Sequence, residues 1–270
     1  MFEREIREQI IEAGKRLYRK GFVASNDGNI SALLEDGNIL ITPTGVCKGD
    51  MRSDQLLKVD LSGWVITGEL KPTSEMKMHL AVYKARKDVK AIVHAHPPKA
   101  TAFAVANLPL DKLSLPEVIF SLGRIALSEY GTPSTNQVPE SVEKVISDCD
   151  AVLLANHGAL TVGDSVMGAY FKMETLEHFA NITILARTLG GERELNKNEE
   201  KELFRIRSDV FGKKGIYCTG CGECEGPERI HEKIPDCVKA ADMKKYGYNN
   251  EAKNIISQIT EDVVRQMIQK

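Results

Sequence analysis

The sequence predicts an α/β protein, a three-layer α/β/α sandwich around a mixed, largely antiparallel central sheet. Short β-like apolar runs alternate along the chain with segments of helical period. The connections lack the glycine-rich fingerprint of dinucleotide-binding folds, and no internal repeat is visible. With 270 residues, 42% of them hydrophobic, the chain is long enough to bury a full core.

The first half begins with an amphipathic helix. Apolar residues from Phe2 to Leu17 recur at helical spacing, and Gly21 marks the end of the helix. Turn residues such as Ser62 and Gly63 separate the short apolar runs that follow. We therefore expect strands at residues 38–42, 56–60, 64–67 and 91–93, with a helix over residues 74–87 before the last of them.

Helices and strands continue to alternate in the second half of the chain. We expect helices over residues 99–106, 141–147 and 165–189, and strands at residues 113–120 and 151–155. Beyond Gly212, glycine, cysteine, proline and charged residues replace the periodic apolar ones. The chain thus divides into a main domain at residues 1–212, a cysteine-rich linker at 213–249 and an amphipathic helix at 250–270.

Composition excludes several classes of function. A formal net charge of -2 without a basic cluster gives no reason to expect nucleic acid as a partner. No stretch approaches the ~20 apolar residues of a membrane span, and the N-terminus lacks the layout of a signal peptide. Six cysteines, three of them closely spaced, suit a reducing compartment. We expect a cytoplasmic protein that binds neither nucleic acid nor a membrane.

Histidines at the ends of two predicted strands indicate a metal centre. His94 and His96 follow the apolar run 91–93, and a strand places residues i and i+2 on one face. Neutral imidazole suits Zn²⁺, and a catalytic zinc needs three protein ligands and an open position. His157 follows a second β-like run and is the predicted third ligand, while Glu75 is a fourth ligand or a general base. Two histidines in helical patterns are expected to pack or cap instead, His79 and His178.

Five ordered motifs carry a family resemblance. They are residues 27–31 (DGNIS), 41–45 (ITPTG), 72–75 (PTSE), 93–97 (VHAHP) and 155–158 (ANHG). Over roughly its first four-fifths the chain resembles the class II aldolase/adducin family, and within it the L-fuculose-1-phosphate aldolases. The resemblance implies a homotetrameric aldehyde-lyase with one Zn²⁺ per subunit and Glu75 as proton shuttle. It also implies reversible retro-aldol cleavage of a ketose 1-phosphate, such as L-fuculose 1-phosphate, to dihydroxyacetone phosphate and a short aldehyde such as lactaldehyde.

The substrate phosphate is predicted to lie on neutral donors. Backbone N–H groups in tight turns and at helix N-termini bind anions without basic side chains. Helix capping or ordinary turn geometry explains each of these residues taken singly, whereas together and in family order they favour binding. The predicted phosphate contacts are Asn29, Thr44, Gly45, Thr73 and Ser74.

One departure from the family concerns its catalytic acid. The fuculose-phosphate aldolases use a tyrosine of a neighbouring subunit as the acid toward the aldehyde oxygen, but Phe120 aligns there and Phe211 aligns with a second family tyrosine. Because a phenyl ring donates no proton, Tyr130, Tyr217 or water takes this role, or the sugar binds in another orientation. Aldolases for 5-deoxypentulose, methylthioribulose or rhamnulose phosphates therefore stay open. So do a pentulose-phosphate 4-epimerase, a methylthioribulose-1-phosphate dehydratase and a non-catalytic adducin-like assembly module.

Two features lie beyond the family match. A set of closely spaced cysteines suits structural zinc or an iron–sulfur cluster, with a metal-free flexible linker as the alternative. Its members are Cys218, Cys221, Cys224 and Cys237, with His231 between the last two. The helix at residues 250–270 resembles the encapsulation peptides of bacterial microcompartment cargo enzymes, which implies a shell protein as partner. The alternative is a terminal helix docked on its own domain or on a neighbouring subunit.

Overall fold

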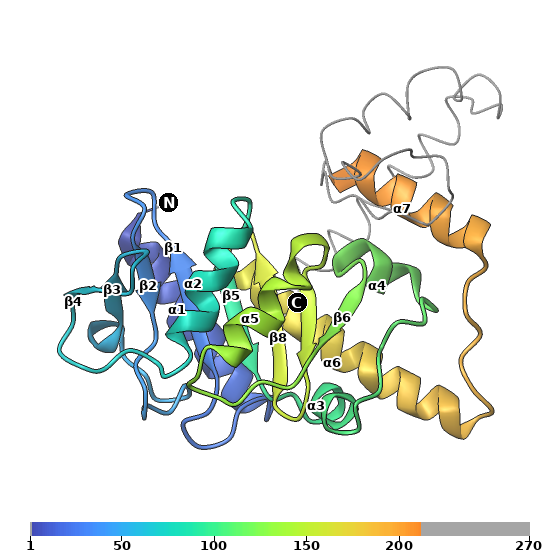
Figure 1. Ribbon diagram of the computed structural model, residues 1–270, viewed down its shortest axis with the longest axis horizontal. Helices are drawn as coiled ribbons and strands as arrows, with labels where there is room; N and C mark the ends of the chain where they lie inside the picture. The colour runs from blue at the N-terminus through green and yellow to red at the C-terminus, as the bar shows by residue number, and fades with distance from the viewer. Residues whose placement is uncertain (1, 212–270) are drawn as a thin grey trace. The chain divides into compact units, whose positions relative to one another are not determined.

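The structure is a computed structural model that describes residues 2–211 (Figure 1). The strands are β1 (Asn29–Leu33), β2 (Ile39–Ile41), β3 (Leu57–Val59), β4 (Val65–Thr67), β5 (Ala91–Ala95), β6 (Ile125–Ser128), β7 (Ala151–Leu154) and β8 (Gly158–Gly163). They form one sheet of eight strands in the order β4-β3-β2-β1-β5-β8-β7-β6. Within this sheet β6 and β7 pair in parallel, and the other neighbours pair antiparallel.

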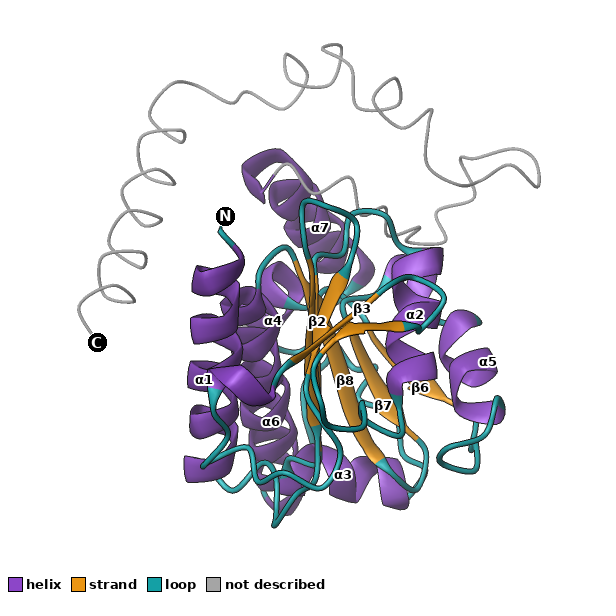
Figure 2. Ribbon diagram, turned by 90° about the vertical axis from the view of Figure 1, so that its left-hand side faces the viewer, coloured by secondary structure: helices purple, strands orange, loops and turns teal. Residues whose placement is uncertain are grey.

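Helices cover both faces of the sheet (Figure 2). The α-helices are α1 (Glu3–Arg19), α2 (Met76–Ala85), α3 (Pro98–Val105), α4 (Pro116–Ser121), α5 (Gln137–Glu143), α6 (Val166–Thr188) and α7 (Lys197–Phe211), and two short 3-10 helices are η1 (Ser53–Gln55) and η2 (Ile146–Asp148). Apolar side chains of α1, α3 and α6 share one core with one face of the sheet. Those of α2 and α5 share a second core with the opposite face. The predicted three-layer sandwich around a mixed, largely antiparallel sheet is therefore confirmed.

Strand β5 lies in the middle of the sheet and contributes to both cores. Val93 packs in the core of α1, α3 and α6, whereas Ile92 packs in the core of α2 and α5. Because side chains alternate between the two faces of a strand, His94 lies on the same side as Ile92 and faces α2. In β1, which pairs with β5, Asn29 stands directly opposite His94. Polar side chains of β1, β5 and α2 therefore meet between the sheet and one helix layer.

The predicted strand at residues 113–120 is wrong. Residues 116–121 form helix α4, in which Pro116 occupies the first turn and Leu115 before it is extended. Proline suits this position because its missing N–H has no partner in a first turn. A short apolar run does not by itself distinguish a strand from a buried helix turn, and here Val118, Ile119 and Leu122 are buried at helical spacing.

Other element boundaries also differ from the prediction. The helix expected at residues 141–147 begins four residues earlier as α5, and its end is the separate 3-10 helix η2. The predictions contained no strand for β1, β6 or β8 and no helix for α7. Strands β1 and β8 are buried along nearly their whole length and carry small or polar residues, so their sequences show little apolar alternation.

Several predictions fall outside residues 2–211. These are the boundary at residue 212, the cysteine set of residues 213–249, Tyr217 and the helix at residues 250–270. They stay predictions. Within residues 2–211 there is no helix whose length and hydropathy would allow it to cross a bilayer.

Candidate active site

Three imidazole rings meet at one end of the central strands. His94 lies in β5, and His96 follows directly after the strand. His157 lies in the turn between β7 and β8, where Leu154 pairs with Gly158. Because β8 also pairs with β5, this turn lies beside the end of β5. The structure thus brings the three predicted ligands together, with one ligand atom of each within 4.8 Å of the others.

The donor set fits a divalent transition metal. The Nε2 atoms of His94 and His96 are 3.2 Å apart. Zinc–nitrogen bonds of about 2.0–2.1 Å in tetrahedral geometry separate two ligand nitrogens by about 3.3 Å. The Nδ1 atom of His94 lies 2.9 Å from the Ala159 carbonyl oxygen. A proton on Nδ1 donates to that carbonyl, which leaves the Nε2 lone pair directed at the other rings.

Close backbone packing holds these rings in place. A Cβ atom at Gly158 would lie 2.5 Å from Cδ2 of His96, so only glycine leaves space for that ring. Gly28 has a φ of +71°, and a Cβ atom there would lie 2.8 Å from the His94 carbonyl oxygen. The carboxylate of Asp27, just before Gly28, lies 3.5 Å from Nδ1 of His96. Asp27 was not among the predicted site residues, although its place in the motif at residues 27–31 was a usable signal.

Glu75 lies at the N-terminus of α2 and reaches the histidines. Its Oε2 atom lies 3.0 Å from Nε2 of His94, and its Oε1 atom lies 3.2 Å from Nε2 of His157. The second contact lacks hydrogen-bond alignment, so Oε1 is a buried oxygen without a hydrogen-bond partner. A buried carboxylate oxygen without a hydrogen-bond partner, beside three imidazoles, is what is expected of a group that would bind a metal ion.

Electrostatics make Glu75 the negative group of the cluster. Burial alone would raise the pKa of Glu75, but the charge of His94 and the contacts with His157 and Asn29 hold it below 4.5. Burial would lower the pKa of His94, but the Glu75 carboxylate raises it above 6.5. Burial and the charge of His94 lower the pKa of His157 to about 4. His157 is therefore neutral near pH 7, the form that binds a metal.

Asn29 contacts Glu75 directly. Its Nδ2 atom donates a hydrogen bond of 2.9 Å to Oε2 of Glu75, and its Oδ1 atom lies 2.5 Å from Nε2 of His79. His79 is fully buried, so the expectation that it packs inside the fold is correct. Its contact with a site residue was missed, because the two positions are 50 residues apart in sequence. The role of Asn29 toward a phosphate stays a prediction.

The other predicted phosphate contacts lie on two adjacent loops. Pro43 and Pro72 form an isolated antiparallel bridge, and the N–H of Thr73 donates to the Thr42 carbonyl. Thr44, Gly45 and Ser74 are exposed on these loops. Thr73 is buried, and its hydroxyl accepts a hydrogen bond from the Glu75 N–H, as a helix cap does. The loops therefore place hydroxyl and N–H groups next to Glu75.

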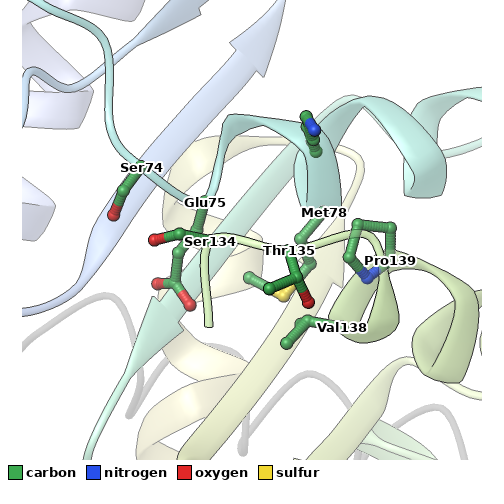
Figure 3. Close-up of a pocket in the computed structure, with 8 residues that line it drawn as sticks. Ser74, Glu75, Met78, Ser134, Thr135, Val138 and Pro139 are labelled. Atoms are coloured by element: carbon green, nitrogen blue, oxygen red, sulfur yellow. The ribbon is translucent and has the colours of Figure 1, made fainter. Parts of the chain in front are cut away.

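A small pocket opens beside Glu75 (Figure 3). It is lined by Ser74 and Glu75, which lead into α2, and by Ser134 and Thr135 of the loop before α5. Ser134 lies in the loop before α5 and has a φ of +66°. This loop adds hydroxyl groups that the sequence analysis did not single out.

The residues discussed as acids lie on later elements. Phe120 lies in α4, and Tyr130 follows β6 with 58% of its surface exposed. Phe211 is the last residue of α7. Tyr130 has no hydrogen bond or ring contact with His94, His96 or His157 in the described part of the chain. The acid therefore stays open between Tyr130, Tyr217 and water, and another orientation of the sugar stays open as well.

Comparisons with known proteins identify the family. Residues 8–184 match the class II aldolase and adducin N-terminal domain. A 3-oxo-tetronate 4-phosphate decarboxylase of Pectobacterium atrosepticum is 35% identical over 68% of this chain and 85% of its own length. An L-fuculose phosphate aldolase of Methanocaldococcus jannaschii is 35% identical over 66% of this chain and 96% of its own length. Among solved structures, an L-fuculose 1-phosphate aldolase superimposes with a TM-score of 0.71 at 30% identity, covering 76% of this chain and 97% of that one. The chain belongs to the class II aldolase and adducin family, whose aldolases use a divalent metal.

Proposed function

We propose that the chain is a zinc-dependent lyase that breaks a carbon–carbon bond next to the ketone of a sugar phosphate. The observation that supports this most is the convergence of His94, His96 and His157 with Glu75. When bound there, Zn²⁺ would act as a Lewis acid on the ketone oxygen. An adducin-like assembly module has no need of this donor set, which argues for an enzyme.

Glu75 is the proposed proton carrier. Breaking the bond leaves an electron pair on the carbon next to the ketone, and that carbon must then take up a proton. Glu75 is mostly buried and is held by Asn29, so its carboxylate stands at a fixed position beside the metal ligands. The exposed donors of Thr44, Gly45 and Ser74 would bind the phosphate and orient the substrate toward it.

Retro-aldol cleavage of a ketose 1-phosphate is the first candidate reaction. L-fuculose 1-phosphate would give dihydroxyacetone phosphate and lactaldehyde. In this reaction the hydroxyl of the departing carbon loses its proton as it becomes the aldehyde oxygen, and the reverse reaction returns that proton. The chain therefore needs an acid–base group at the aldehyde end in addition to Glu75. An epimerase would need the same group, because it retains the aldehyde fragment and rejoins it.

Decarboxylation of a 3-oxo sugar-acid phosphate is the second candidate, and Phe120 favours it. The departing carboxylate is already ionised and leaves as neutral carbon dioxide, so this reaction needs no acid–base group at the departing fragment. Glu75 would pass a proton taken up from water to the carbon that keeps the electron pair. A phenylalanine at the aligned tyrosine position costs a decarboxylase nothing, and relatives named 3-oxo-tetronate 4-phosphate decarboxylase match this chain.

A product assay separates the two candidates. Purified protein with Zn²⁺ is offered a panel of ketose 1-phosphates, with dihydroxyacetone phosphate measured by a coupled enzyme, and a 3-oxo-tetronate 4-phosphate, with carbon dioxide measured. Glu75→Gln is expected to lower kcat about 10²- to 10⁴-fold on the true substrate. His94→Ala should abolish turnover, while the matched control His178→Ala, at an exposed position of α6, should not. A kcat of Glu75→Gln within about tenfold of wild type, or turnover by His94→Ala, refutes the proposal.

The assembly and location of the chain are separate proposals. A homotetramer would let a neighbouring subunit complete the site, and light scattering of the purified full chain tests it. A microcompartment shell protein is the proposed partner of residues 250–270. Deleting these residues should leave turnover unchanged and abolish co-purification with shell protein, whereas lost turnover would indicate a structural helix.

A further inference from the structure

A row of buried polar groups runs from the inside of α2 to Glu75. The hydroxyl of Tyr83 lies 2.8 Å from Ser31 Oγ, and Ser31 Oγ lies 2.6 Å from Nδ1 of His79. On the other side of the ring, Nε2 of His79 lies 2.5 Å from Oδ1 of Asn29. The Asn29 amide then donates to Glu75 over 2.9 Å. We call Tyr83, Ser31, His79, Asn29 and Glu75 the β1–α2 hydrogen-bond chain.

Sequence spacing places these side chains in two facing rows. Asn29 and Ser31 are two residues apart on β1 and therefore share one face of the strand. Glu75, His79 and Tyr83 follow at intervals of four residues, from the N-terminus of α2 onward, and therefore share one face of the helix. The two rows interdigitate, so that each strand residue bonds two residues of the helix row.

The carboxylate at one end sets the direction of every hydrogen bond. An ionised Glu75 only accepts, so Asn29 turns its NH₂ group toward Glu75 and its carbonyl oxygen toward His79. His79 must then carry its proton on Nε2. Burial and the nearby charge of His94 lower the pKa of His79 to about 3, so the ring is neutral and Nδ1 accepts. Ser31 donates to Nδ1, and Tyr83 donates to Ser31.

We propose that His79 is a positioning residue that, through the Asn29 amide, fixes the Glu75 carboxylate in the place from which it acts on the substrate. No hydrogen bond in this chain can be reversed by itself, because the reversal would place two donors or two acceptors opposite each other. A ring with its proton on Nε2 keeps the Asn29 amide from flipping. Buried networks of this kind specify one arrangement when every member is satisfied. The role in turnover rests on the proposed function, whereas the direction of the bonds does not.

The direction of the bonds is tested without any assay of turnover. The full-length protein is labelled with ¹⁵N-histidine, and the ring signals of His79 are assigned by their loss in a His79→Gln variant. A neutral ring protonated on Nε2 is the expected state. A ring protonated on Nδ1, or on both nitrogens near neutral pH, would overturn the proposal.

Two substitutions of His79 separate positioning from simple packing. Glutamine places an amide NH₂ near the position of Nε2 and can still donate to Asn29, whereas asparagine reaches only the position of Nδ1. We expect His79→Gln to keep kcat within about twofold, and His79→Asn to lose about 10- to 100-fold in kcat with a smaller change in KM. Crystal structures should show the Asn29–Glu75 bond kept in the Gln variant and lost in the Asn variant.

A buried hydroxyl outside the hydrogen-bond chain provides the control. Thr161 of β8 is fully buried, and its Oγ1 donates to the Ala169 carbonyl. Thr161→Val and Ser31→Ala each remove one buried hydroxyl, but only Ser31→Ala should lower kcat and mix the tautomers of His79. The proposal is refuted if His79→Gln and His79→Asn lose kcat equally and in proportion to their losses in melting temperature. His79 would then act only through packing. A loss mainly in KM would refute the assignment of Asn29 to Glu75. If wild type turns over no substrate of the panel, the proposed function fails, while the tautomer and the crystal structures still decide the rest.

Discussion

Replacing Gly158 by alanine should weaken metal binding without unfolding the protein. The added Cβ atom would lie 2.5 Å from Cδ2 of His96 and 2.7 Å from the Ala95 carbonyl oxygen. Carbon atoms pack at about 3.5 Å or more, so the His96 ring must move by about 1 Å. A metal site tolerates errors of about 0.2 Å in its ligand distances. The displaced ring therefore leaves the range in which three histidines can bind one ion.

We expect the metal affinity of the Gly158→Ala variant to fall about 10- to 100-fold, as when a supporting residue of a metal site is removed. Titration of Zn²⁺ against a chelator of known affinity measures this directly, and circular dichroism verifies that the fold is kept. The matched control is Gly37→Ala in the turn between β1 and β2, where φ is +83° but no atom lies within 4 Å of the new Cβ. Gly37→Ala should cost about 1 kcal/mol of stability from backbone strain and leave metal affinity unchanged. Wild-type affinity in Gly158→Ala would refute the reasoning about the His96 ring.

Three further predictions follow from other groups. Lys48 is almost fully buried, donates to the Val46 and Asn26 carbonyls, and has its pKa lowered by burial from 10.5 to about 8. The unfolded chain holds this proton up to a higher pH than the folded one. The free energy of unfolding should therefore rise by about 3 kcal/mol between pH 8 and 10.5 relative to Lys48→Met. Urea unfolding measures it, and an equal change with pH in the free energies of unfolding of the two proteins would contradict the prediction. Asp150→Ala removes a carboxylate that lies 2.6 Å from Lys172 Nζ and 3.1 Å from Arg86 in a buried ion cluster. Chemical denaturation should show that the free energy of unfolding falls by about 3–5 kcal/mol. The control Glu129→Ala, at the exposed pair with Lys144, should leave the denaturation midpoint unchanged. Chelation of the metal should abolish turnover until Zn²⁺ is restored. At a free Zn²⁺ concentration 1,000 times Kd, the metal should add about 4 kcal/mol to the free energy of unfolding. Full turnover in the presence of chelator would refute the metal assignment.

Local spacing was enough to predict the parts of the site that depend on one strand end. His94 and His96 lie two residues apart at the end of an apolar run, and a strand turns both to one face. The strand at residues 113–120 failed for the opposite reason, since a few apolar residues fit both periods and Pro116 decided for a helix.

The supporting groups were not predictable from spacing alone. Asn29 and Glu75 are 46 residues apart, and Ser31 and Tyr83 are 52 apart, so only the pairing of β1 with β5 and the packing of α2 on them brings these groups into contact. Asn29 and Ser31 are polar residues two positions apart in a strand, and Glu75, His79 and Tyr83 follow at four-residue intervals. These two patterns each indicate a polar face. The patterns show which residues share a face of one element, but not which other element packs against that face.

His94 and the hydroxyl groups proposed to face the substrate sit on different kinds of structure. His94 belongs to a central strand bonded on both sides, whereas Thr44, Ser74 and Ser134 lie on connecting loops. Mutations in a connection are tolerated far more readily than mutations in the middle of a sheet. With the phosphate contacts on loops as proposed, a change of substrate would need changes in the loops and would leave His94 and its strand in place. Relatives named as aldolases and relatives named as decarboxylases both match this chain, as such a separation would allow.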